Sequence, residues 1–349
     1  MIITLQFIGV LAGLILLHEI GHFIAARIFG VEVEEFGIGF PPKMLTLFKM
    51  GGTEYTLNWL PFGGFVRPKG EGDPDVPGGL AAAKPMVRIA VFLAGPFMNL
   101  LIAVIVYSII FSQTGVPDWN TVEILAVDSN SPAEAAGLQA GDIVEYINDV
   151  TIDSDEALRD EVYANLEQTI SIVYQRDGEE GEVSLVPRQN PPEGEGAIGI
   201  IMSNPMRKIG WFQALPMGAV ATYHHCVAVL TIPAQLLRGT QGASRPVGFK
   251  GMHEIYQVAT SQELIPEASV SVNILAFVVS VTVSLGILNL LPIPALDGGR
   301  ILFALPELIF KRRISQRVQN ITNSVSFVIL IALLFYINIL DFINPVSLP

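Results

Sequence analysis

The sequence is poor in cysteine, histidine and charged residues, and each shortage excludes a class of protein. The 349 residues include one cysteine, Cys226, so an intrachain disulfide and a cysteine-rich metal site are both excluded. The five histidines are too few for a membrane di-iron hydroxylase or desaturase, which needs several histidine clusters. Charged residues make up 15% of the chain and hydrophobic residues 51%, with a mean hydropathy of +0.51. This composition is typical of an integral membrane protein rather than a soluble globular one.

The net charge of −13 is concentrated in one part of the chain. Residues 113–204 hold 19 acidic and 3 basic residues, whereas the rest of the chain holds 14 acidic and 17 basic residues. We therefore expect an acidic soluble domain inserted into a nearly neutral membrane core. An acidic balance of this kind argues against a nucleic-acid partner, which requires a basic face.

Four apolar stretches are long enough to cross a bilayer, since a span needs about 20 mostly apolar residues. They are residues 1–26, 89–112, 268–296 and 321–340. The first stretch has neither a basic segment before it nor a small-residue cleavage site, so we expect a retained membrane helix rather than a signal peptide.

A fifth stretch, residues 214–237, is uncharged but contains two prolines and two histidines. The distribution of Lys and Arg helps to place it. Residues 27–88 hold seven basic residues and residues 311–317 hold four, whereas the 155 residues from 113 to 267 hold only eight. With four spans, both basic segments face the cytoplasm and the acidic domain lies outside, as the positive-inside rule requires. We therefore expect residues 214–237 to lie on the membrane or dip into it, with a fifth span as the alternative.

The first apolar stretch carries three ionisable residues, His18, Glu19 and His22. An ionisable residue inside a membrane costs roughly 2.5–3.5 kcal/mol or more, so three in one helix indicate a function. Two histidines at positions i and i+4 of a helix face the same way and can bind one Zn²⁺, while the glutamate between them can activate water. The pattern predicts a zinc protease with its metal inside the bilayer.

A catalytic zinc usually has three protein ligands, so a third must come from elsewhere in the membrane core. Between Glu267 and Glu307 the only acidic residue is Asp297, which we expect to be that ligand. The alternative is a buried ion pair between Asp297 and Arg300. The other histidines are expected on the surface or at the membrane interface; they are His224, His225 and His253.

The segment after the first apolar stretch has the pattern of a β-hairpin. Residues 35–42 and 55–66 are β-prone, contain Gly and Pro, and are joined around residues 50–52. One interpretation is a hairpin in the cytoplasm. The other is a re-entrant hairpin that dips toward the metal and pairs an extended substrate along its open edge.

Residues 119–203 resemble a PDZ domain. They contain a strand at 121–127, the run Ser-Pro-Ala-Glu-Ala-Ala-Gly-Leu at 131–138 and the run Ala-Gly-Asp-Ile-Val-Glu-Tyr-Ile-Asn at 140–148. A helix at 155–166 and strands at 169–176 and 182–187 follow. The segment closest to a carboxylate-binding strand, residues 197–200, comes last, which suggests a circularly permuted version. A PDZ domain would bind peptide ends by strand addition. The alternative is a rigid spacer that binds nothing.

Three motifs together resemble the site-2 protease family of intramembrane zinc metalloproteases. They are the HEIGH motif at 18–22, residues 88–99, and residues 289–298 with the pattern Asn-x-x-Pro-x-Pro-x-Leu-Asp-Gly. The single PDZ-like segment is similar to bacterial members such as the regulator of sigma-E protease. The resemblance covers essentially the whole chain.

The resemblance implies specific roles. One zinc per chain would be bound by His18, His22 and Asp297, and Glu19 would be the catalytic residue. Substrate contacts would be made by Asn289, Gly63 and Gly64, while the core around the site would be shaped by Gly95, Pro96 and Asn99. Substrates would be single-span membrane proteins already trimmed outside the membrane, such as anti-sigma factors, or remnant signal peptides.

The sequence therefore predicts an α-helical polytopic membrane protein with about four transmembrane helices, a re-entrant β-hairpin and one inserted extracytoplasmic α+β PDZ domain. We expect it in the bacterial inner membrane. The expected parts are a membrane core at 1–117 and 268–349, a PDZ domain at 118–203 and an interfacial segment at 204–267. Two other functions fit less well. A protease with an interfacial site would use a downstream glutamate in place of Asp297, and a non-enzymatic scaffold would have no need of Glu19.

Overall fold

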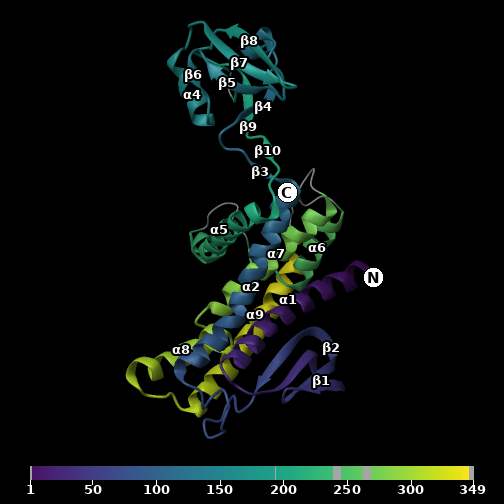
Figure 1. The fold of residues 1–349 in the computed structure, drawn as a ribbon. Helices are drawn as coiled ribbons and strands as arrows, with labels where there is room; N and C mark the ends of the chain where they lie inside the picture. Colours follow the sequence, from purple (N-terminus) through teal and green to yellow (C-terminus); the bar gives the residue numbers. More distant parts are fainter. Residues whose placement is uncertain (1, 193, 239–244, 262–268, 346–349) are drawn as a thin grey trace. The chain divides into compact units, whose positions relative to one another are not determined.

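The computed structural model describes residues 2–192, 194–238, 245–261 and 269–345 and forms two compact units. The first, here called the membrane unit, combines Met1–Phe111 with Gly210–Pro349, and the second, the inserted unit, is Ser112–Ile209. Figure 1 shows the ribbon of both.

The membrane unit is built from seven described helices and one β-hairpin. The helices are α1 (Ile2–Ile28), α2 (Pro85–Thr114), α5 (Trp211–Leu237), α6 (Phe249–Thr260), α7 (Val270–Leu290), α8 (Asp297–Phe310) and α9 (Gln316–Ile343). Among the described residues, five helices are long and apolar enough to cross a membrane, namely α1, α2, α5, α7 and α9. The chain is thus a multi-pass membrane protein. Helix α5 covers residues 214–237, the stretch for which the sequence allowed either a position on the membrane or a fifth span. The predicted count of four spans stays a prediction.

The predicted third span, residues 268–296, extends too far at its carboxyl end. Helix α7 stops at Leu290, whereas the apolar stretch continues to Leu296. Pro292 and Pro294 explain the difference, because proline lacks an N–H donor and disfavours helical backbone at the residue before it. The chain resumes helical structure at Asp297, the first residue of α8. The predicted start of this span, residue 268, lies outside the described residues.

Small residues bring the central helices close together. A Cβ atom on Gly21 of α1 would overlap the carbonyl oxygen of Ala94 in α2, so only glycine permits this approach. Helices α2 and α7 share a buried apolar cluster whose members are Ala103, Val106, Val279, Val283 and Ile287. Figure 1 shows these helices side by side. The packing places the carboxyl-terminal half of α1 against α2.

Helix α5 crosses α2 at a steep angle. The Ser108 hydroxyl of α2 donates to the Ala214 carbonyl at 3.3 Å, and the Tyr107 hydroxyl lies 2.8 Å from His225 Nδ1. Ala214 and His225 are eleven residues apart, which corresponds to about 16 Å along a helix. Both contact neighbouring residues of α2, so α5 runs across that helix rather than along it (Figure 1).

The predicted hairpin is present and is longer than expected. Strands β1 (Val33–Met50) and β2 (Thr53–Pro68) pair antiparallel. The turn residues Gly51 and Gly52 have φ values of 59° and 84°, which favour glycine. Strand β2 packs against α1, where Gly63 and Gly64 lie against Ile15 and Leu16. Whether the hairpin enters the membrane stays a prediction.

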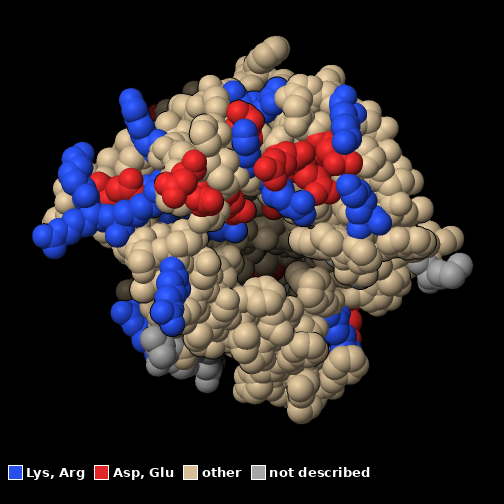
Figure 2. Space-filling model, turned by 90° about the horizontal axis from the view of Figure 1, so that it is seen from below, with Lys and Arg blue, Asp and Glu red and all other residues tan. Residues whose placement is uncertain are grey.

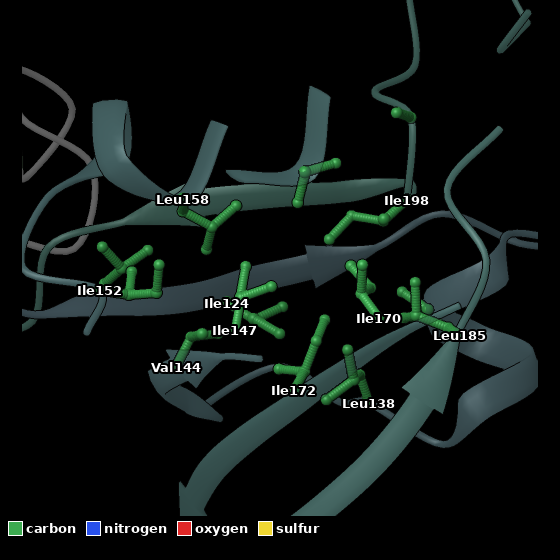
Figure 3. Packing of buried hydrophobic residues seen from close by; sticks show 14 residues of the cluster. Ile124, Leu138, Val144, Ile147, Ile152, Leu158, Ile170, Ile172, Leu185 and Ile198 are labelled. Carbon is green, nitrogen blue, oxygen red and sulfur yellow. The ribbon is translucent and has the colours of Figure 1, made fainter. Parts of the chain in front are cut away.

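The inserted unit is a small α+β fold. Its elements are β3 (Val116–Pro117), β4 (Val122–Val127), α3 (Pro132–Ala136), β5 (Ile143–Ile147), β6 (Val150–Thr151), α4 (Asp155–Ala164), β7 (Ile170–Arg176), β8 (Glu179–Leu185), β9 (Ile200–Ser203) and β10 (Met206–Arg207). The main sheet has the antiparallel order β8-β7-β5-β4-β9, with β6 paired to β5. Figure 3 shows its core, in which branched side chains such as Ile124, Ile147 and Ile172 pack together.

Ser131 and Asp142, two polar residues of the small-residue run at 131–142, each have a structural role. The Ser131 hydroxyl caps α3 by accepting from the Glu134 amide at 3.1 Å, and Gly137 ends the helix with φ of 88°. Asp142 is fully buried and binds the Arg176 guanidinium with two hydrogen bonds of 2.6 and 2.7 Å. The motif therefore has a structural role in the inserted unit, since it caps α3, ends α3 and binds β7 through Asp142 and Arg176.

The last strand of the inserted unit lies at an edge of the sheet. Ala197 and Ile198 are buried in the core, and β9 begins only at Ile200, three residues later than the strand we expected. Within the described residues β9 pairs only with β4, which leaves its other edge open. An open edge of this kind can accept a peptide as an additional strand.

Candidate metal centre

Helix α1 and the start of α8 hold the three predicted metal ligands. His18 and His22 are one helical turn apart on α1, and Asp297 is the first residue of α8. Their side chains are 7%, 11% and 12% exposed. The fold thus gathers three ligands from segments 279 residues apart into one shielded cluster.

The distances within the cluster suit a tetrahedral zinc. His18 Nε2 lies 3.1 Å from Asp297 Oδ2 and 3.1 Å from His22 Nε2, and His22 Nε2 lies 3.2 Å from Asp297 Oδ2. Ligand atoms about 2.0–2.1 Å from a tetrahedral zinc are about 3.3 Å apart. In the described part of the chain these three residues are the one group of ligand type that could hold a metal. Two imidazoles and one carboxylate leave a fourth position open, as in catalytic zinc sites.

Glycine at position 95 of α2 keeps this space clear. A Cβ atom on Gly95 would overlap His22 Nε2 and lie 2.7 Å from His18 Nε2. A methyl group would therefore occupy the position that faces both ligand nitrogens. The close approach of α1 and α2 places Gly95 next to the ligands, and its lack of a side chain leaves space for a metal ion there.

A backbone carbonyl of α2 orients His22. The Nδ1–H group of His22 donates to the Val91 carbonyl oxygen at 2.8 Å, so Nε2 is left with a lone pair for a metal. This contact could not be predicted from the sequence, because every residue has a backbone carbonyl.

Asn99 is the corresponding partner of His18. The Asn99 side-chain nitrogen lies 3.0 Å from His18 Nδ1, and the Asn99 Oδ1 atom is buried without a hydrogen-bond partner. A half-turn of the amide exchanges its nitrogen and oxygen, so that Oδ1 accepts from Nδ1–H and Nε2 becomes the metal-binding atom. Asn99 thus holds His18 in the tautomer and orientation that a metal requires.

Replacing Asn99 with alanine is expected to weaken zinc binding about 10–100-fold, because His18 loses the group that orients it. Zinc affinity would be measured by competition with a chelator. Ser108→Ala provides a control, since Ser108 is also buried on α2 but bonds to Val104 and Ala214 instead. Equal zinc affinity in the Asn99→Ala variant and the wild type would contradict this role.

The carboxylate of Asp297 is held in its charged form. Burial alone would raise the pKa of Asp297, but hydrogen bonds and charge interactions with His18 and His22 keep that pKa well below its usual range. The alternative ion pair with Arg300 is not formed, because the Arg300 guanidinium donates to Glu71 at 2.6 Å. A negatively charged Asp297 directed at two imidazoles is what a metal site requires.

Glu19 lies beside the cluster and contacts the hairpin. Its Oε2 atom accepts a hydrogen bond of 3.1 Å from the backbone amide of Val66 in β2. The carboxylate predicted to be catalytic is thus tied to the strand predicted to hold a substrate. The remaining histidines lie elsewhere: His225 contacts Tyr107, and His253 contacts Thr4 at 3.2 Å.

The three predicted substrate contacts differ in their surroundings. Asn289, in the last turn of α7, is partly exposed and its side chain has no hydrogen bond among the described residues. Gly63 and Gly64 are buried against α1, where a Cβ atom would lie 2.5 Å from Ile15 and 2.9 Å from Leu16. Close packing accounts for these two glycines, and their contact with a substrate stays a prediction.

Comparison with known proteins gives matches along nearly the whole chain. The model of peptidase family M50 matches residues 6–333. A predicted zinc metalloprotease of Clostridium perfringens is 32% identical, over 96% of this chain and 97% of its own length. The regulator of sigma-W protease RasP of Bacillus subtilis is 28% identical, over 88% of this chain and 90% of its own.

Two solved structures match part of the chain. The PDZ domain of an SdrC-like protein from Listeria monocytogenes is 22% identical and covers 24% of this chain and 88% of its own, with a TM-score of 0.22. The second domain of the Listeria protein Lin2157 is 25% identical, covers 25% and 86% respectively, and also has a TM-score of 0.22.

Proposed function

Because the chain belongs to peptidase family M50, and is therefore a metalloprotease, we propose that it is an intramembrane zinc endopeptidase. His18, His22 and Asp297 would bind one Zn²⁺ per chain. The convergence of these three residues beside Glu19, with both histidines on a helix that can cross a membrane, is the observation that carries the proposal. The family match agrees with the resemblance to site-2 proteases seen in the sequence.

The chemistry is peptide-bond hydrolysis. When bound, Zn²⁺ supplies Lewis acidity, which acidifies water and polarises the scissile carbonyl. Glu19 takes a proton from the attacking water and passes it to the leaving amine, so the C–N bond breaks and a carboxylate and an amine form. His22 and His18 are fixed by Val91 and Asn99, so they do not reorganise during the reaction.

The substrate class follows from the surroundings of Glu19. A peptide bond in an intact helix is shielded by its own hydrogen bonds, so a transmembrane substrate must be held extended. Val66 links Glu19 to β2, whose backbone can pair with an extended segment. The proposed substrate contacts are Gly63 and Gly64 of β2 and the Asn289 amide, which has no hydrogen bond among the described residues. We propose single-span membrane proteins as substrates, either anti-sigma factors or remnant signal peptides.

The proposed activity is tested with the purified full-length protein and a single-span reporter in proteoliposomes. Cleavage within the reporter's membrane segment is expected, and a zinc chelator should stop it. Adding zinc, but not magnesium, should restore it, because imidazole ligands favour zinc. Cleavage that continues after zinc has been removed would contradict a zinc-dependent reaction.

The proposed orientation places the basic segments in the cytoplasm and the inserted unit outside the bacterial inner membrane. The steep crossing of α5 over α2 supports an α5 that lies in the membrane surface rather than spanning it. A cysteine introduced at Asn130, with Cys226→Ala as background, should react with an impermeant maleimide in spheroplasts. Reaction only after lysis would reverse the orientation.

We further propose that the inserted unit limits access to substrates already cut outside. Its open β9 edge can bind a peptide end. Deleting residues 118–203 should leave cleavage of a pre-trimmed reporter unchanged while allowing cleavage of an untrimmed one, measured as the ratio of the two rates. Loss of cleavage of the pre-trimmed reporter would contradict the gating role.

A further inference from the structure

The membrane unit contains a polar cavity whose lining residues are separate from the metal ligands. It has a volume of about 290 Å³ and lies between α2, α8, α9 and the loop after β2. Three arginines line it, Arg88, Arg300 and Arg313, together with amide side chains of α9 such as Asn320 and Asn323. Figure 2 views this end of the unit from below and shows basic and acidic side chains in a band beside a hollow.

The arginines at the cavity outnumber the acidic groups that contact them. Arg88 pairs with Glu307, and Arg313 Nε lies 3.7 Å from the same carboxylate. Arg300 pairs with Glu71 at 2.6 Å. Among the described residues, three guanidinium groups therefore share two carboxylates, which leaves an excess of one positive charge at the cavity.

The guanidinium groups also have unused hydrogen-bond donors. Each arginine offers five N–H donors. Within the described chain, Arg88 donates only to Glu307, Arg300 only to Glu71 and Arg313 only to the Ala81 carbonyl. The Arg88 side chain is 9% exposed, and its Nε atom is buried with no partner. The Arg300 and Arg313 side chains are 41% and 31% exposed, so they can reach a ligand that enters from outside. A cluster of this kind suits an anion with several oxygen acceptors, and guanidinium groups match phosphate in geometry.

The elements around the cavity indicate that this anion belongs to a lipid. Helix α8 is amphipathic: Arg300, Phe303 and Ala304 face the cavity, whereas Leu302 and Ile309 are 44% and 63% exposed. This helix has 14 residues, fewer than the about 20 that cross a bilayer, and it runs from the metal ligand Asp297 toward the basic residues Lys311, Arg312 and Arg313. We expect those basic residues at the cytoplasmic surface of the membrane, so the end of the cavity that Arg313 lines is at the depth of lipid headgroups, with the exposed Leu302 and Ile309 nearby for acyl chains.

We propose that this cavity binds the phosphate headgroup of an anionic phospholipid. Basic pockets between transmembrane helices are a recurrent site for such headgroups. The uncompensated positive charge selects phosphatidylglycerol over phosphatidylcholine, whose choline carries a positive charge of its own. The site is independent of the proposed peptide hydrolysis, because none of its arginines contacts the metal cluster among the described residues.

The test uses the full-length protein in a neutral detergent, titrated with dioctanoyl phosphatidylglycerol, dioctanoyl phosphatidylcholine or inorganic phosphate. Bound lipid is counted by native mass spectrometry, and affinity is taken from the rise in thermal midpoint. Phosphatidylglycerol should bind about tenfold or more tightly than the other two, because it alone combines a net negative charge with acyl chains.

Variants locate the site. Arg300→Gln with Arg313→Gln should weaken phosphatidylglycerol binding about tenfold or more, whereas Lys311→Gln with Arg312→Gln removes the same charge beside the cavity and should have little effect. Equal binding of phosphatidylcholine, equal binding of inorganic phosphate, or equal loss in both double variants would overturn the proposal. The comparison of lipids in the wild type decides the question even if a variant fails to fold.

Discussion

The Glu19→Gln variant is expected to cleave a single-span reporter about 10²–10⁴-fold more slowly than the wild type while binding the same amount of zinc. Glutamine has nearly the shape of glutamate but cannot take a proton from water, so general-base catalysis is lost. Its amide oxygen can still accept the hydrogen bond from the Val66 amide. Geometry and metal are therefore preserved while proton transfer is not. Single-turnover cleavage rates and zinc content would be measured on the same preparations.

Glu34→Gln is the matched control for this variant. Glu34 lies on β1, is exposed, and makes no side-chain bond among the described residues, so its loss should leave the rate unchanged. Turnover of Glu19→Gln at the wild-type rate would rule out Glu19 as the general base. A parallel loss of zinc would instead assign Glu19 to the integrity of the metal site.

The second large effect is expected from Gly95→Ala. Alanine is a better helix former than glycine by about 1 kcal/mol, so the local preference of α2 would favour the substitution. The added methyl group, however, would overlap His22 Nε2 and lie 2.7 Å from His18 Nε2. We therefore expect a folded protein that has lost most of its zinc and its cleavage activity. Zinc per chain and the thermal midpoint would separate these two effects.

Gly13→Ala tests whether the effect is specific to the site. Gly13 lies in α1 upstream of His18, and a Cβ atom there has no atom within 4 Å. This variant gains the same helix propensity and should keep its zinc. Wild-type zinc content in Gly95→Ala would mean that α1 and α2 are farther apart at the site than the structure indicates.

The metal ligands could be anticipated from sequence because of where they stand. Charged residues in apolar stretches are costly, so HExxH in the first helix and the isolated Asp297 each required an explanation. The Val91 carbonyl could not be anticipated, since a backbone group leaves no mark in the sequence. Asn99 entered only through the family resemblance. The reason for Gly95 depends on the distance between α1 and α2, which a sequence does not contain.

Other features could not be predicted from the sequence, some for local reasons and some because they depend on contacts between distant segments. The end of α7 at Leu290 is not evident in the sequence, because the apolar stretch continues around Pro292 and Pro294 with Leu291, Ile293, Ala295 and Leu296. The arginine-lined cavity collects residues from Glu71 to Asn323, and no local pattern links them. The crossing of α5 over α2 likewise emerges only from its contacts with Tyr107 and Ser108.

The central claim is that two distant membrane segments share one zinc. The most direct measurement is zinc per chain, by mass spectrometry, in the detergent-purified wild type and in Asp297→Ala. We expect about one zinc in the wild type, and most of it lost in the variant, since a site reduced from three protein ligands to two binds the metal poorly. No zinc in the wild type, or the same zinc content in both proteins, would contradict a site formed by His18, His22 and Asp297.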